Sequence, residues 1–99
     1  MDLSHGFIPL ALNASLSALD ALAAGDGLRS DDLIAGAIAL DLLASQGHYS
    51  HTRVNGLMTA VLGLRILATR QSVSESQEGR RAATHFAAIV REMQNHLFN

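Results

Sequence analysis

Cysteine, lysine and tryptophan are absent from this sequence of 99 residues, and proline occurs once. The absence of cysteine excludes disulfide bonds, thiolate catalysis and cysteine-ligated metal sites. Aromatic residues make up only 4% of the chain, so a core must be built from aliphatic side chains and methionine. Leucine, alanine and methionine favour helices, whereas strands favour β-branched and aromatic residues. The composition therefore predicts an all-α protein.

The length fits a single helical domain that covers residues 1–99. With 48% apolar and 16% charged residues, the chain is too hydrophobic to be disordered. The N-terminus has Asp2 where a secretory signal would have basic residues, and the uncharged run from Phe7 to Leu19 is too short to span a bilayer. We therefore expect a cytoplasmic protein. A basic set made only of arginine is typical of a GC-rich bacterial or phage genome.

Helical periodicity and helix-stop signals predict four helices. Their expected bounds are Pro9 to the stop at Gly25–Asp26–Gly27, Ser30 as an N-cap to Gln46–Gly47, Ser50 or His51 to about Arg70, and Ser72 or Ser74 to at least Leu97. The last helix could begin at either of two capping boxes, Ser72 with Glu75 or Ser74 with Gln77, and its apolar stripe is expected to include Phe86, Val90 and Met93. Short connections between such helices imply antiparallel neighbours. We expect a small antiparallel bundle of about four helices.

The second predicted helix is apolar around most of its circumference. From Leu33 to Ser45, only Asp41 and Ser45 are polar. Such a helix is either central in a bundle or shared across an oligomer interface, and a chain this short would have difficulty covering it. We therefore expect a homodimer. In the third helix, the apolar stripe is expected to include Met58 and Leu62.

Two charged residues lie within these apolar surfaces. Asp41 is placed between Ile34 and Leu40 on the second helix, and Arg65 between Val54 and Met58 on the third. An isolated buried charge costs several kcal/mol and is normally paired. One hypothesis is that Asp41 and Arg65 form a buried pair, within a subunit or across a dimer. The alternative is that the Arg65 stem lies on the core while its guanidinium reaches water.

The segment Gly47–Gly56, with the sequence GHYSHTRVNG, contains the densest group of polar side chains. Gly47 suits a helix C-terminus and Ser50 suits an N-cap, while Tyr49 can anchor its ring and expose its hydroxyl. On this interpretation the segment is a junction between two helices, and His48, His51 and Thr52 are ordinary turn and first-turn residues.

A second interpretation assigns histidine phosphotransfer to the same segment. The run from His51 to Leu57 resembles the H-box of some sensor-kinase dimerisation and phosphotransfer helices, where Asn follows the phosphoacceptor His by four residues. The resemblance covers about twenty residues and implies a helical hairpin that dimerises. It assigns His51 as a phosphoacceptor and Asn55 as its neighbour. The family has an acidic residue or Arg directly after the His, whereas this chain has Thr52.

A third interpretation is DNA binding. The segment from Leu42 to Leu57 resembles a helix-turn-helix whose second helix presents Thr52, Arg53 and Asn55 to a major groove. Nucleic-acid binders usually carry a large basic excess, but this chain has a net charge of −2 and a pI near 6.2. We therefore rank a nucleic-acid partner below a protein partner.

Enzymatic chemistry has little support in this sequence. His48 with His51, and Glu92 with His96, have spacings compatible with metal ligation and offer four possible ligands. The His48 pair spans a helix start, so its geometry is not preset, and the Glu-x-x-His repeat of di-iron bundles is missing, so no metal or other cofactor is expected. Neither a glycine-rich phosphate loop nor a nucleophile elbow occurs. We expect a non-enzymatic interaction module, an adaptor, inhibitor or accessory regulator. Its expected contact surfaces are the outer side of the second helix and the face of the fourth that carries Arg80, Arg81 and Arg91.

Overall fold

The computed structural model describes residues 3–98, and the side chains of residues 6–97. Within that range the chain forms five helices and no strand. The helices are α1 (Leu3–Ala23), α2 (Ser30–Ala44), α3 (His51–Thr69), α4 (Gln71–Ser74) and α5 (Gln77–Phe98). The all-α prediction is confirmed. The helix α4 is a single turn between the third and fourth long helices, and the sequence did not predict it as a separate element.

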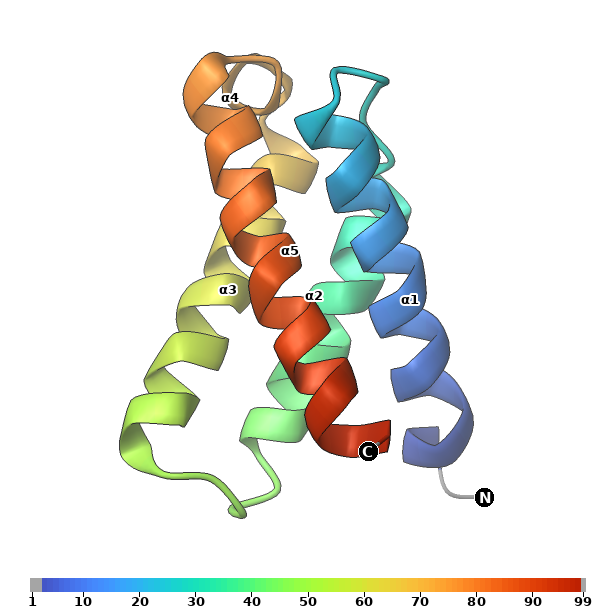
Figure 1. Ribbon diagram of the computed structural model, residues 1–99, viewed down its shortest axis with the longest axis vertical. Coiled ribbons are helices and arrows are strands. Elements are labelled where there is room, and N and C mark those ends of the chain that lie inside the picture. Colours follow the sequence, from blue (N-terminus) through green and yellow to red (C-terminus); the bar gives the residue numbers. More distant parts are fainter. Residues whose placement is uncertain (1–2, 99) are drawn as a thin grey trace.

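The four long helices pack so that each contacts two others (Figure 1). Contacts join α1 to α2, α2 to α3, α3 to α5, and α5 back to α1, which places α2 behind α5. Consecutive long helices run in opposite directions. The radius of gyration is 12.7 Å, close to the value of about 13 Å expected for a globular chain of this length.

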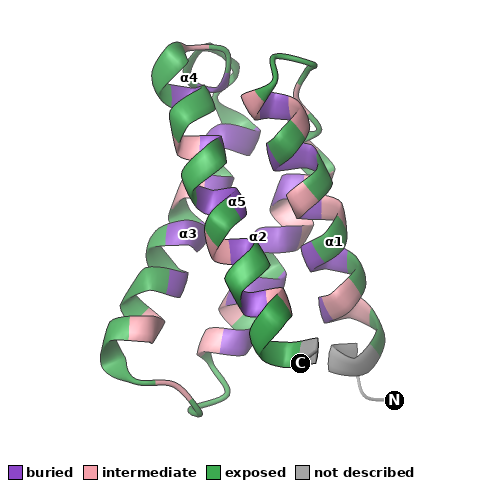
Figure 2. Ribbon diagram, viewed as in Figure 1, coloured by how far each residue is buried: buried purple, intermediate pink, exposed green. Residues whose placement is uncertain are grey.

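The core lies between these helices and consists mainly of leucine and alanine (Figure 2). Each fully buried leucine contributes about 1.5–3 kcal/mol by leaving water. Phe86 is buried in this core, and Phe7 and Tyr49 are partly buried against it. The largest apolar side chains with almost no exposure are Leu12, Leu19, Leu33, Leu40, Leu43, Leu57, Leu64, Leu67, Val90 and Met93.

Most predicted helix ends agree with the structure, but three helix starts differ. The first helix begins at Leu3, so Pro9 lies inside it, where proline removes one backbone hydrogen bond. In α2, Arg29 occupies the N-cap position. Ser30 is the first helical residue, and its hydroxyl donates to the carbonyl of Ala68 on α3 at 2.8 Å. Ser30 therefore ties two helices together instead of capping one.

The start of α5 also corrects the prediction. The helix begins at Gln77, and the hydroxyl of Ser76 accepts a hydrogen bond from the backbone N–H of Gly79 at 3.0 Å. Neither capping box begins the helix. Ser74 is buried and donates to the carbonyl of Gln71 instead, because the chain makes the turn of α4 before α5 starts.

The length of α1 changes one argument about membranes. By length and composition alone, Gly6–Ala23 is sufficient to cross a bilayer, although the uncharged run from Phe7 to Leu19 has only thirteen residues. The core helix of a globular protein passes the same test. In this structure, Leu12 and Leu19 of α1 are fully buried against the other helices.

Candidate functional site

The polar segment Gly47–Gly56 joins α2 to α3 and begins α3, as predicted. Gly47 has a φ of 74°, in the left-handed region that favours glycine. The hydroxyl of Ser50 accepts from the backbone N–H of Arg53 at 3.2 Å and caps α3. Tyr49 is half-buried, and its ring centroid lies 5.7 Å from that of His96 on α5. The junction is therefore tied to the C-terminal end of α5.

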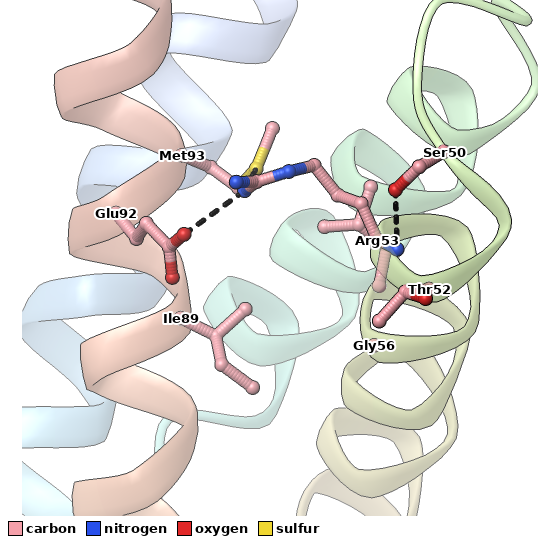
Figure 3. Close-up of a pocket in the computed structure, with 8 residues that line it drawn as sticks. Ser50, Thr52, Arg53, Gly56, Ile89, Glu92 and Met93 are labelled. Atoms are coloured by element: carbon pink, nitrogen blue, oxygen red, sulfur yellow. Dashed lines mark hydrogen bonds and ion pairs between the residues drawn. The ribbon is translucent and has the colours of Figure 1, made fainter.

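A groove lies between the N-terminal half of α3 and the C-terminal half of α5 (Figure 3). Phe86 packs against Gly63 where the two helices approach each other, and from there the helices diverge towards the start of α3. The groove has a volume of about 300 Å³. Its lining residues are Ser50, Thr52, Arg53, Gly56, Leu57, Ile89, Glu92 and Met93.

The floor of the groove is apolar and its rim is charged. Leu57 and Met93 are almost completely buried beneath it, and Ile89 is half-buried at its side. Across the rim, Nη1 of Arg53 lies 3.1 Å from Oε1 of Glu92 and 3.7 Å from the Met93 sulfur. This arrangement suits an apolar side chain whose neighbours carry polar or charged groups.

Gly56 lines the groove without a side chain. A Cβ added at Gly56 would meet no atom within 4 Å outside its own helix. A larger side chain at this position would therefore extend into the open space of the groove between α3 and α5. Sequence reasoning did not single out Gly56 as a binding residue, although a glycine inside an apolar helix is a signal of this kind.

The structure places both residues of the phosphotransfer hypothesis on the surface. His51 is the first residue of α3, and Asn55 follows one turn later; both are exposed. Neither lines the groove. Exposure of His51 is what a phosphoacceptor requires, and the assignment stays a prediction.

The arginines of α3 and its C-cap, Arg53, Arg65 and Arg70, do not share one face. Arg53 turns towards α5, where it pairs with Glu92. At 100° per residue, Arg65 lies about 120° away from Arg53 around α3. Arg70 follows the last residue of the helix as its C-cap. A major-groove reader would need these cations on a single convex surface.

No potential metal centre is found among the residues that the structure describes: no group of three or more His, Asp or Glu side chains lies close enough to hold an ion. The neighbour of His96 is Tyr49, which is a ring contact and not a ligand set.

Asp41 and Arg65 do not form the predicted pair within one chain. Arg65 is exposed and Asp41 is half-buried, and their side chains do not form an ion pair. The hydrogen bond from Ser30 to Ala68 sets the register of the antiparallel helices α2 and α3. In this register Asp41 lies beside residue 57 of α3, so Arg65 is eight residues, or about 12 Å, further along α3. The prediction of a pair inside one subunit is therefore wrong.

The apolar surroundings of these charges face outwards. Met58 and Leu62 were predicted to belong to the core stripe, but they are 36% and 61% exposed. They form a row along α3 with Ile66, at intervals of four residues, and beside them α2 exposes Ile38 and Leu42. We call this surface, Ile38, Leu42, Met58, Leu62 and Ile66, the outer apolar face.

The predicted arginine surface on α5 is exposed, but some of its side chains already contact other parts of the chain. Arg91 donates to both carboxylate oxygens of Asp20 on α1, at 2.9 Å and 2.8 Å. The guanidinium of Arg80 lies against Gly25 in the loop after α1. Arg81 is exposed on the same helix. Two of the three cations therefore contact α1 or its loop.

Comparison with known proteins adds no information about function. No protein-family model, curated protein or solved structure matches this chain.

Proposed function

We propose that this chain is a non-enzymatic helical interaction module, an antiparallel bundle that acts by binding another protein. The observation that carries the proposal is the groove between α3 and α5. It combines an apolar floor, a charged rim and an unoccupied position at Gly56. A groove between two helices is a common receptor for the apolar face of a partner helix.

The shape of the groove favours a protein segment over a metabolite. Its volume of about 300 Å³ is at the lower limit for small-molecule sites, and its convergent polar groups are few. Arg53 and Glu92 already neutralise each other, so the rim attracts neither anions nor cations strongly. An amphipathic segment would insert an apolar side chain over Leu57 and Ile89 while its polar residues meet the rim.

The chemistry of the groove argues for binding without catalysis. Its hydroxyl groups belong to Ser50 and Thr52, no histidine lines it, and its one carboxylate, Glu92, is paired with Arg53. The Ser50 oxygen accepts a backbone hydrogen bond as a helix cap. A nucleophilic mechanism requires a base within hydrogen-bond reach of the hydroxyl.

Phosphotransfer is the second candidate, and it is favoured by one observation. His51 is exposed at the start of α3, with Asn55 one turn away. DNA binding receives less support, because the cations on α3 do not form a single surface.

Affinity purification from the native host tests the proposal with two matched variants. Gly56→Leu fills the groove, and Gly6→Leu makes the same change at an exposed glycine of α1, where an added Cβ also meets nothing within 4 Å. We expect wild type and Gly6→Leu to retain a stoichiometric protein partner that Gly56→Leu loses. Equal recovery with all three proteins would exclude the groove as the binding site.

The same purification separates the alternatives. His51→Ala should retain the partner if the groove binds it. Loss of a response-regulator-like protein with His51→Ala alone would support phosphotransfer instead. Recovery of nuclease-sensitive DNA in place of protein would overturn the interaction-module proposal.

A further inference from the structure

The outer apolar face lies on the side of α2 and α3 away from α5, and the groove is not part of it. Leu62 is 61% exposed at its centre, and Ile66 and Leu42 are exposed towards its ends. Isolated exposed apolar residues are normal on protein surfaces, but five on two adjacent helices form a patch of the kind that interaction sites use. The groove and the outer face are therefore separate candidates for binding.

Asp41 and Arg65 lie along the seam between the two helices. On α2, Ser30 contacts α3, and Asp41 follows Ser30 by three helical turns on the same side. On α3, Ala68 accepts the hydrogen bond from Ser30, and Arg65 lies one turn before Ala68. Both charges therefore border the same seam, one on each helix.

The positions of these charges are symmetric about the middle of the face. In the register set by Ser30 and Ala68, residue 37 of α2 lies beside residue 61 of α3. Asp41 is four residues from this level in one direction, and Arg65 is four residues from it in the other. Each charge is thus about 6 Å from the centre along the helices. Ile38 and Leu62 lie next to the centre itself.

We propose that the outer apolar face binds a second copy of this chain. The twofold axis lies in the interface, perpendicular to α2 and α3, at the level of Ile38 and Leu62. This rotation places the α2–α3 seam of one subunit over the α2–α3 seam of the other, and the two seams run in opposite directions. Asp41 then lies beside Arg65 of the partner subunit, and Arg65 lies beside the partner's Asp41. The charge complementarity of the face with itself identifies the occupant, since an isologous interface requires a self-complementary surface.

The interface gives a physical reason for two charges among apolar residues. A purely apolar pair of helices permits several registers, whereas two reciprocal ion pairs favour one. Because the groove between α3 and α5 is outside this interface, the dimer would present two grooves. The proposal does not depend on the groove binding a partner.

Sedimentation equilibrium of residues 1–99 tests this dimer. We expect a concentration-dependent monomer–dimer equilibrium for wild type and a monomer for Leu62→Asp. Leu10→Asp is the control, because Leu10 is 72% exposed on α1 and outside the face. Circular dichroism checks that each variant keeps its helical content. A monomeric wild type would overturn the proposal, as would a dimer that Leu62→Asp leaves intact.

Charge exchange tests the arrangement. Asp41→Arg and Arg65→Asp should each weaken dimerisation by roughly tenfold, and the double variant should recover most of the wild-type affinity. A double variant as weak as the single ones would overturn the reciprocal pairing.

Partner capture by monomeric Leu62→Asp, together with dimerisation of Gly56→Leu, would show that the groove and the face act separately.

Discussion

The ring of Phe86 on α5 packs directly against the backbone of Gly63 on α3. Gly63 contributes no side chain at this position, so the ring of Phe86 fills the space that a Cβ on residue 63 would occupy. Below this point α3 and α5 diverge, and the groove begins. The contact between these two residues therefore sets where the groove closes.

Gly63→Ala should destabilise the protein. The added methyl group would overlap the ring of Phe86, and relief requires α5 to shift or the ring to leave its position. Overpacking of this kind typically costs about 1–3 kcal/mol, despite the higher helix propensity of alanine. Urea denaturation followed by circular dichroism measures the change in the free energy of unfolding. An increase in stability would mean that the helices are not in contact here.

Gly56→Ala, two turns earlier on the same helix, should have the opposite effect. Its added methyl group meets nothing within 4 Å, so only the helix propensity changes. We expect a gain of about 0.5–1 kcal/mol, since glycine loses more backbone entropy than alanine on entering a helix. The same denaturation experiment measures it, with Gly63→Ala as the paired comparison. A loss of stability would show that the groove is narrower than the structure indicates.

Local signals predicted most of the helix boundaries. Gly25 and Gly47 take positive φ values after α1 and α2, and Ser50 caps α3 through its side chain. Each of these features depends on a residue and its immediate neighbours, which is the information that a sequence contains most directly. The core stripe of α5, with Phe86, Val90 and Met93 buried, was also predicted correctly.

Long-range packing was less predictable. The third helix is apolar over more than one side, and periodicity alone does not say which side meets the core. Met58 and Leu62 were therefore assigned to the core, but they face outwards, while Gly63 turns towards Phe86. The groove depends on two glycines and on the angle between helices far apart in sequence, so no local pattern indicated it.

Ser30 illustrates the same limit and leads to a further prediction. Its hydroxyl appeared suited to an N-cap, but it donates to the carbonyl of Ala68 at 2.8 Å. Ser30→Ala should lower the free energy of unfolding by about 0.5–1.5 kcal/mol, because a partly buried hydrogen bond between helices is lost. Ser72→Ala, at an exposed position of α4, is the control. Equal effects of the two substitutions in thermal denaturation would argue against the contact between α2 and α3.

The ion pair between Asp20 and Arg91 should contribute little to stability, although it joins residues 71 positions apart. Both side chains are about half exposed, so water and salt screen their attraction. A double-mutant cycle with Asp20→Asn and Arg91→Gln should give a coupling energy of about 0.2–1 kcal/mol at low ionic strength, falling towards zero in molar salt. Unfolding titrations at two salt concentrations measure it. A larger coupling that persists in high salt would show that the pair is shielded from solvent, and Arg91 would then be a structural residue unsuited to partner binding.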